Sequence, residues 1–505
     1  MTVEFTRRGV AKGFAALALA ANGAVPLRAL EPGTCDPQIV GWVPKLRADL
    51  EAMASMLTAT LKPWSGPKRI FTPEAYGHAG AGGALATGAI QAAIDAAGKA
   101  GGGTVRLARG DYVSGTIVLR SNVRFEVAKG ARLLASLDLK DYPEHVPQRP
   151  TVMDSNMGMN QSLIFAEACE NISLCGEGLI DGRGTRDNFP GEETPHRTPG
   201  RPFLIRIIDC KRVHIKDIHL KDAAGWMQNY LNCEDLLIEG INVSNQANVN
   251  NDGLDVDGCR RVIVRNSFIC SEDDGMCFKG ASQRPMEQVL VENCEFYSSC
   301  NAMKFGTDSQ GDFRKVLVRN CVVGGPSIDM RVWRPRMSDS GISWEVVDGG
   351  TVEDILVTDV HIVRAKSPLF LRLGDRGRVR PEQAPPKPGN LRRIVYDRIT
   401  GAGNGERGSY FIGLPDKLIE DVVLRDVNIG VLATYQPVPD ESTIDELRDK
   451  YPDAFMVGWV SPAFGLWTRH IRRLTMIRVS FIASAPDPRP MILTKTDSSD
   501  LCTGR

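Results

Sequence analysis

Three stretches of the chain repeat one phrase and decide the fold: CRRVIVRNSFIC (259–270), MEQVLVENCEFY (286–297) and FRKVLVRNCVVG (313–324). In each, two polar residues precede an apolar–any–apolar pattern, and this period of two is typical of a β-strand. The first apolar residue of the phrase recurs at Ile172, Val213, Leu236, Val262, Val289, Val316, Ile355, Ile394, Val422 and Leu474. Most steps are 23 to 28 residues, with longer ones of 39, 41 and 52. Short strands at this period predict an all-β solenoid, a parallel β-helix whose coils bury one another's inward faces.

The repeat also sets the domain organisation. We expect one β-helix domain over residues 71–485, an N-terminal extension over 31–70 and a C-terminal tail over 486–505. Residues 90–100 have apolar side chains at helical spacing and end at a glycine cluster, which predicts a helix that caps the first coil. Residues 46–61 predict a second amphipathic helix.

The first 30 residues resemble an export signal. Thr-Arg-Arg-Gly-Val-Ala-Lys (6–12) precedes an apolar run at 13–21, and the paired arginines are typical of the twin-arginine type. A short buried helix is the alternative. The run is too short to span a membrane, which takes about 20 residues. We therefore expect a signal peptide over residues 1–30 and a periplasmic or secreted protein without a membrane span.

Charge and cysteine content narrow the function classes. Lys plus Arg and Asp plus Glu both number 61, so the chain has no overall field that would hold nucleic acid or an anionic membrane. Twelve cysteines in 505 residues are too few for a disulfide scaffold. Several of them fall one per repeat, at Cys169, Cys210, Cys233 and Cys259, which favours stacked structural thiols over a metal site. No cofactor or metal is expected, and the oligomeric state stays open.

Candidate chemistry lies in two consecutive coils. Asp252 in Asn-Asn-Asp-Gly lies 21 and 22 residues before Asp273 and Asp274, about one coil, so the three carboxylates should share one surface. Clustered carboxylates repel, which lets one stay protonated as an acid while others act as bases, the division of labour of glycosidic cleavage. Aspartates that cap turns, or a calcium site, are the alternatives.

These signatures resemble the polygalacturonase family, glycoside hydrolase family twenty-eight. Asn250-Asn251-Asp252-Gly253 and Asp273-Asp274 resemble the family's Asn-Thr-Asp and Gly-Asp-Asp motifs. Further similarity runs in order through Gly101–Val105, Gly176–Gly182, Ala224–Trp226, Phe411–Pro415 and Phe464–His470, and covers about residues 71 to 481. The resemblance implies a right-handed parallel β-helix and hydrolysis with inversion. It also implies that Asp273 is the general acid and that Asp252 and Asp274 activate water.

The chain departs from the family pattern at two motifs. Asn301 replaces the histidine of Gly-His-Gly, and the Arg-Ile-Lys motif is not intact, its nearest counterpart being Met-Arg-Val-Trp-Arg (330–334). These changes resemble the rhamnogalacturonan-directed and exo-acting branches of the family. Guanidinium and ammonium groups beside the aspartates favour recognition of a uronate, with charge balance as the alternative. The expected substrate-binding residues are Asn250, Lys279, Asn301, Lys304, Arg331, Arg334 and His470.

Long insertions favour action at chain ends. They lie at residues 324–350, 367–390 and 434–464, and loops beside the acidic cluster would close an open groove into a pocket. Trp333 or Trp344 could stack on a sugar ring. We therefore expect a glycoside hydrolase that acts on a pectic polysaccharide or oligosaccharide. A β-helix lyase that uses a basic residue, and a non-catalytic glycan-binding β-helix, are the alternatives.

Overall fold

The computed structural model describes residues 41–78, 84–152, 154, 160–190, 200–380, 382–494 and 502–504. The expected signal peptide, residues 1–30, lies outside these ranges. In the described part of the chain, we find no helix with the length and apolar character needed to cross a bilayer.

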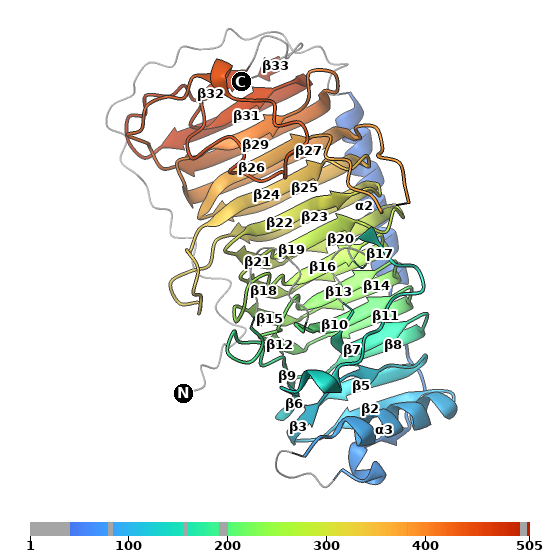
Figure 1. Ribbon diagram of the computed structural model, residues 1–505. Helices are drawn as coiled ribbons and strands as arrows, with labels where there is room; N and C mark the ends of the chain where they lie inside the picture. The colour runs from blue at the N-terminus through green and yellow to red at the C-terminus, as the bar shows by residue number, and fades with distance from the viewer. Residues whose placement is uncertain are drawn as a thin grey trace.

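The described strands form a parallel β-helix, as predicted, with coils stacked along one axis (Figure 1). One parallel ladder contains β1 (Ile70–Phe71), β2 (Gly103–Leu107), β5 (Val123–Val127), β8 (Glu170–Cys175), β11 (Lys211–Lys216), β14 (Glu234–Glu239), β17 (Arg260–Arg265), β20 (Met286–Glu292), β23 (Phe313–Gly324), β25 (Thr351–Val363), β27 (Asn390–Asn404), β29 (Ile419–Val431), β31 (Ile471–Ala483) and β33 (Cys502–Gly504). A second contains β3 (Gly110–Ser114), β6 (Ala131–Ala135), β9 (Leu179–Asp181), β12 (His219–Lys221), β15 (Asn242–Asn245), β18 (Phe268–Ser271) and β21 (Glu295–Ser298), and joins the first at β23.

The third ladder is a separate 12-stranded sheet, here called the site sheet. Its strands in order are β4 (Ile117–Val118), β7 (Ser162–Glu167), β10 (Phe203–Ile208), β13 (Gln228–Leu231), β16 (Leu254–Asp257), β19 (Met276–Gly280), β22 (Asn301–Ser309), β24 (Ser338–Val346), β26 (Ala365–Leu373), β28 (Ser409–Ile412), β30 (Leu466–Arg469) and β32 (Ile492–Thr494). Early coils thus contain three short strands, and from β23 onward one long strand replaces two of them.

The repeated phrase stacks in register. Each first apolar residue pairs with its counterpart in the next coil, from Ile172 with Val213 through to Val422 with Leu474. These side chains are buried in one continuous core. The sequence period therefore equals the length of a coil. A shift of the strand register by one residue would turn the apolar side chains outward.

Aromatic side chains fill the core beneath the site sheet. The ring of Phe313 lies 4.8 Å from that of Phe278, 4.9 Å from that of Phe305 and 6.0 Å from that of Trp344. Trp344 is fully buried among them. The suggestion that Trp344 stacks on a sugar is therefore wrong, because its position in β24 points inward.

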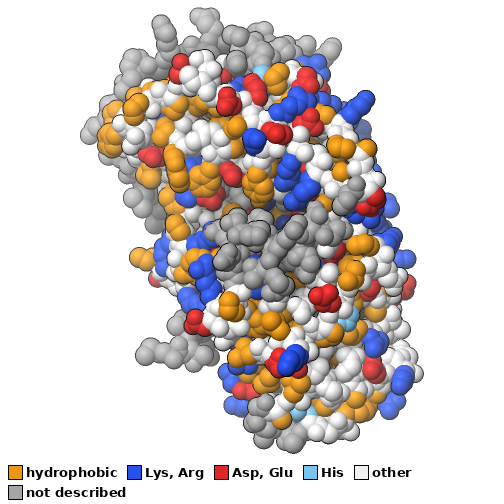
Figure 2. Space-filling model, viewed as in Figure 1, with side chains coloured by type: hydrophobic (Ala, Val, Ile, Leu, Met, Phe, Trp, Pro, Cys, Tyr) orange, Lys and Arg blue, Asp and Glu red, His pale blue; other side chains and the backbone are white. Residues whose placement is uncertain are grey.

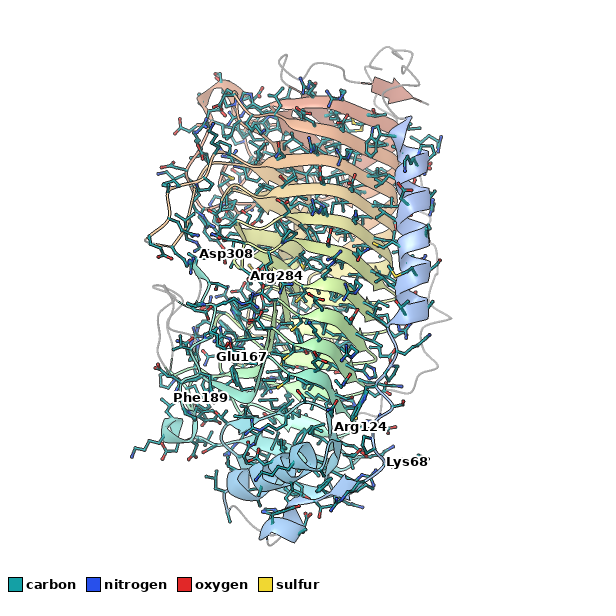
Figure 3. The ribbon with its side chains drawn as sticks, turned by 90° about the vertical axis from the view of Figure 1, so that its right-hand side faces the viewer. Lys68, Arg124, Glu167, Phe189, Arg284 and Asp308 are labelled. Atoms are coloured by element: carbon teal, nitrogen blue, oxygen red, sulfur yellow. The ribbon has the colours of Figure 1, made fainter. Side chains whose placement is uncertain are left out.

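Two helices complete the fold of the described residues. Helix α3 (Thr87–Lys99) covers the first coil with its apolar face, which confirms the predicted cap. Helix α2 (Trp42–Thr60) lies along the stack on the side away from site-sheet residues such as Glu167 and Asp308 (Figure 3). Three further short helical turns lie at η1 (Pro73–Tyr76), η2 (Leu139–Asp141) and η3 (Glu441–Thr443).

Helix α2 covers an outward-facing apolar column of the first ladder. The column consists of neighbouring residues in seven strands: Leu237, Ile263, Leu290, Leu317, Leu356, Val395 and Val423. Six steps of about 4.8 Å give about 29 Å, and the 19 residues of α2 span about 28 Å. The helix therefore matches the apolar column in length.

The thiols of the repeat are structural, as predicted. Cys210, Cys233 and Cys259 are fully buried, and the backbone N–H of Cys233 donates to the Cys259 sulfur at 3.2 Å. The described cysteines whose side chains are placed are all free thiols.

Candidate active site

The acidic cluster lies at the start of three neighbouring strands of the site sheet. Leu254, Met276 and Met303 pair in register, so the residues two positions earlier, Asp252, Asp274 and Asn301, occupy equivalent places in successive coils. Backbone hydrogen bonds fix this order, because Gly253 N donates to Asp274 O and Gly275 N to Asn301 O, both at 2.8 Å. The predicted spacing of one coil is confirmed.

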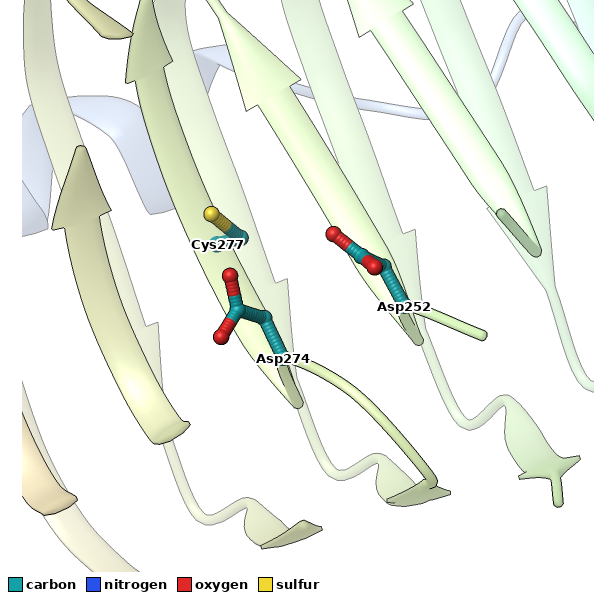
Figure 4. A group of neighbouring side chains, drawn as sticks. All are labelled: Asp252, Asp274 and Cys277. Carbon is teal, nitrogen blue, oxygen red and sulfur yellow. The ribbon is translucent and has the colours of Figure 1, made fainter. Parts of the chain in front are cut away.

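The carboxylates lie close together (Figure 4). One oxygen of Asp252 lies within 4.8 Å of one oxygen of Asp274. One oxygen of Asp273 likewise lies within 4.8 Å of one oxygen of Asp274. Asp252 and Asp274 are each only 3% exposed, whereas Asp273 is half-buried. Asp273 is thus the member of the trio with the most access to a ligand.

Asp274 is clamped by two donors. Lys304 Nζ donates to its Oδ2 at 2.7 Å and Asn301 Nδ2 to its Oδ1 at 2.8 Å. Ser340 Oγ donates to Asn301 Oδ1 at 2.6 Å, which fixes the amide. Burial alone would raise the pKa of Asp274, but the charges of Lys304 and Lys279 outweigh it and lower the pKa. Asp274 is therefore ionised at neutral pH.

Asp252 has the opposite character. Burial, together with the neighbouring carboxylates of Asp255 and Asp273, raises the pKa of Asp252 well above its usual value. Lys279 opposes this only from 3.8 Å. The pKa values of two carboxylates in equivalent positions are therefore shifted in opposite directions, as acid–base chemistry requires.

Other acidic side chains of this face were missed from the sequence. Asp255 and Asp257 are outward-facing in β16, and burial raises the pKa of each to about 6. Burial also raises the pKa of Glu345 in β24 to about 7. The signal was present in Leu-Asp-Val-Asp (254–257), where acidic residues alternate with apolar ones directly after Asp252.

The predicted basic residues already have carboxylate partners. Lys279 Nζ lies 3.2 Å from Asp255 Oδ1 and 4.5 Å from the centre of the Trp226 ring. Arg331 Nη2 lies 3.2 Å from Asp222 Oδ2, and Arg334 Nε lies 2.5 Å from Glu272 Oε1. The structure thus brings Lys279, Lys304, Arg331 and Arg334 to the acidic cluster or its rim, and charge balance accounts for part of their placement.

Asn250 belongs to the cluster, but His470 does not. Asn250 Nδ2 donates to Asp273 Oδ2 at 3.2 Å. His470 directly follows β30, four strands beyond β22, and its Nε2 lies 3.0 Å from the Glu446 carboxylate. At about 4.8 Å per strand, this places it about 20 Å along the sheet from Asn301. The structure therefore anchors a loop with His470 and does not bring it to the aspartates.

Trp333 lies beside the site with two cations close to its ring. Arg186 is 4.6 Å and Arg334 5.2 Å from the centre of its ring. These contacts occupy surfaces on which a sugar would stack.

The cluster fits a metal poorly. Asp252, Asp274 and Cys277 have possible ligand atoms within 4.8 Å of one another (Figure 4). However, burial raises the pKa of the Cys277 thiol well above its usual value, and Lys279 Nζ donates to its sulfur at 3.2 Å. Hard cations prefer oxygen ligands, and the two lysines already supply positive charge.

Three loops from later coils surround the site sheet. Loop 325–337 reaches back to earlier coils through Arg331 and Arg334. Loop 374–389 does so through Arg380 Nη1, which donates to Pro150 O at 3.4 Å. Loop 432–465 is held by Arg372 Nη2, which donates to Glu446 O at 2.9 Å. The expected insertions 324–350 and 367–390 were too long, because strands β24 and β26 occupy part of them.

The described structure contains cavities in several places. One of about 630 Å³ lies beside α2 and includes Trp42, Met53 and Lys315, remote from the carboxylates. A smaller one of about 20 Å³ lies against Lys279, between Trp226 and Asp257. Over the face shown in Figure 2, acidic and basic side chains are interspersed, which agrees with the zero net charge.

Comparisons with known proteins agree with this geometry. Residues 116–436 match the family described as "Glycosyl hydrolases family 28". A "Probable polygalacturonase" of Vitis vinifera is 27% identical over 213 residues, 40% of this chain and 43% of that protein. An "Exo-poly-alpha-D-galacturonosidase" of Dickeya chrysanthemi is 24% identical over 249 residues, 40% of each chain. The matched part thus spans about two fifths of these relatives' length.

A solved structure has the same fold. The hyperthermoactive exopolygalacturonase of Thermotoga maritima superimposes with a TM-score of 0.64 at 18% identity, over 76% of this chain and 91% of that one. This likeness supports the right-handed parallel β-helix. Because the family profile covers more than half of the chain, and the paired aspartates of its motifs meet on one sheet, the protein belongs to glycosyl hydrolases family 28.

Proposed function

We propose that the protein hydrolyses glycosidic bonds of a pectic, uronate-containing polysaccharide or oligosaccharide. The observation that supports this most directly is the arrangement of Asp252, Asp273 and Asp274 on neighbouring coils, in which Lys304 keeps the buried Asp274 ionised beside the half-buried Asp273. Hydrolysis needs a group that removes a proton from water and a group that gives one to the leaving oxygen.

The geometry fits a shared nucleophilic water. O–H···O hydrogen bonds are about 2.7–2.8 Å long, so one water can contact two carboxylate oxygens that lie within 4.8 Å of each other, as those of Asp252 and Asp274 do. Asp274, held ionised by Lys304, takes the water proton as the oxygen attacks the anomeric carbon. Asp273 gives its proton to the departing sugar oxygen as the glycosidic bond breaks.

Inversion is part of the proposal, but carboxylate spacing is not its basis. Inverting enzymes usually separate their carboxyl groups by about 6.5–9.5 Å, whereas the nearest oxygens of Asp273 and Asp274 lie within 4.8 Å. The proposal depends instead on the family resemblance and on a water held by the protein. A proton NMR time course of the first product tests whether the anomeric configuration is inverted. Initial retention of configuration would contradict the proposed inversion.

Uronate recognition and action at chain ends extend the proposal. Lys279 and Lys304 lie in the acidic cluster. Loop 325–337 reaches it through Arg334, which pairs with Glu272, and loop 432–465 through Tyr451, which interacts electrostatically with Lys304 and Asp274. The named relatives include an exo-acting enzyme, an exo-poly-alpha-D-galacturonosidase. A rapid fall in viscosity at low extents of cleavage would mean an open groove and would contradict exo action.

The decisive experiment compares the wild type with Asp273→Asn on a panel of pectic oligosaccharides. Asp421→Asn, which removes a carboxylate paired with Arg473 on another ladder, is the matched control. New reducing ends from the wild type and the control, but not from Asp273→Asn, support the hydrolase. An unsaturated product that absorbs in the ultraviolet would indicate a lyase, and binding without new reducing ends would indicate a non-catalytic module.

We also infer export to the periplasm or the medium. The paired arginines at 7–8 and the following apolar run support this. Cell fractionation of the wild type and of a variant with both arginines changed to lysine tests it, and equal export of both would contradict it.

A further inference from the structure

Arg201 is a buried guanidinium beside the acidic cluster that the sequence did not single out. Only 8% of the residue is exposed. Its Nη1 donates to Val249 O, and its Nη2 donates to Asn250 Oδ1 at 3.2 Å. Within the described ranges no carboxylate forms an ion pair with Arg201, although it interacts electrostatically with Glu272, Asp252 and Asp273.

The contact with Arg201 fixes the orientation of the Asn250 amide. A guanidinium has only donors, so it must face the amide oxygen of Asn250. The amide nitrogen then faces the opposite way, toward Asp273, and Nδ2 donates to Oδ2 at 3.2 Å. An inverted amide would oppose two donors at Arg201, so the chemistry of the pair permits one orientation.

This orientation determines which oxygen of Asp273 holds a proton. Oδ2 accepts the Asn250 hydrogen bond, so the proton of the neutral carboxyl is directed to Oδ1. The backbone of Asp273 is held as well, because Ser271 Oγ donates to its carbonyl at 2.8 Å. When the proton leaves, the new carboxylate keeps the Asn250 donor and the nearby charge of Arg201.

We propose that Arg201, acting through Asn250, is a positioning residue that presents the Asp273 proton on Oδ1 to the leaving oxygen and stabilises the carboxylate that remains. The inference rests on the proposed function, because it assigns the acid step to Asp273. The stabilising effect of Arg201 is larger in the transition state than in the ground state, since negative charge forms on Asp273 only as the proton moves.

The test compares two leaving groups. General acid catalysis contributes about 10²–10⁴ when the leaving group is a sugar alcohol, but 4-nitrophenolate leaves without a proton. We expect Arg201→Met to lower kcat on an oligogalacturonide by about 10-fold to 100-fold, and to change kcat on 4-nitrophenyl galacturonide by less than about threefold. Arg201→Lys should recover part of the loss. Arg489→Met, which removes a buried arginine paired with Asp487 in the last coils, should resemble the wild type on both substrates.

Rescue by the conservative variant gives a second readout that a merely structural role would not change. Arg201→Lys keeps the positive charge beside Asn250, so its loss of kcat on the oligogalacturonide should be smaller than that of Arg201→Met. Asn250→Ala, at a half-buried position, should show the same difference between the two substrates if Arg201→Met fails to fold.

The outcomes separate the two proposals. Equal losses on both substrates, or equal losses in folded Arg201→Lys and Arg201→Met, would overturn the role of Arg201 while leaving the hydrolase proposal intact. A folded wild type that cleaves neither the oligogalacturonide nor the aryl galacturonide would overturn the proposed function, and this inference with it.

Discussion

Replacing Lys304 by Met should move the acid limb of the pH profile upward. Lys304 Nζ lies 2.7 Å from Asp274 Oδ2 and is almost fully buried, so little solvent screens the pair. Asp274 must be ionised to accept a proton from water. Activity therefore rises with pH through the pKa of Asp274, and a raised pKa shifts this rise to higher pH.

The magnitude follows from the contact. An opposite charge within about 4–6 Å lowers an aspartate pKa by about 1–3 units, and removing it should raise the pKa by a similar amount. Lys279 and the Asn301 hydrogen bond remain, so we expect a shift near the lower end of this range.

The assay is kcat/KM on one oligogalacturonide from about pH 4 to 8, with thermal unfolding measured in parallel. Lys304→Arg keeps the charge and is the matched control, so its acid limb should stay near that of the wild type. Removing one partner of a buried ion pair destabilises a protein by about 3–5 kcal/mol, and a lower Tm in Lys304→Met is expected. An unchanged acid limb in a folded Lys304→Met protein would refute Lys304 as the group that keeps Asp274 ionised.

Four further outcomes are expected. Asp273→Asn should lower turnover by about 10²–10⁴ with an unchanged Tm, because an amide cannot donate the proton; turnover within threefold of the wild type would contradict the acid assignment. A chelator should leave activity unchanged, since lysines supply the positive charge of the cluster; loss that Ca²⁺ restores would contradict this. Leu57→Ala, which removes a fully buried side chain of α2, should cost about 2–5 kcal/mol of unfolding free energy with kcat retained; denaturant titration measures this, and an unchanged midpoint would mean that α2 does not hold the apolar column. KM for an oligogalacturonide should rise from about pH 5 to pH 7.5, as Asp255 and Asp257 ionise near Lys279; a KM that falls over this range would contradict it.

The fold was predictable because one coil is one sequence repeat. A parallel β-helix places residue i of each coil beside its counterpart in the next, so the period-two strand phrase and its spacing contain the register directly. The same rule places Asp252 beside Asp274. The helix that caps the first coil was predicted separately, from apolar residues at helical spacing.

Pairing among charged groups was not predictable from spacing. Arg331 contacts Asp222, more than one hundred residues earlier, because loop 325–337 folds back over preceding coils. Loop direction depends on contacts that no local pattern encodes. His470 appeared in a family-like phrase, yet its ring lies beside Glu446 of a distant loop. The position of Arg201 was also not predictable, because its contact with the Asn250 amide joins two residues 49 positions apart.

The distribution of raised and lowered pKa values gives the site a limited working range of pH. Uronates are ordinary carboxylic acids and stay ionised above about pH 5. Below about pH 6 Asp255 and Asp257 become neutral, so the charge of Lys279 is no longer compensated and attracts an anionic sugar. Asp274 tolerates such acidity because Lys304 and Lys279 lower its pKa. If the proposed function holds, substrate affinity should therefore weaken as these buried acids ionise, while catalysis should fail only when Asp274 is protonated. The pH interval between these two events is then the range in which the protein can both bind and cleave its substrate.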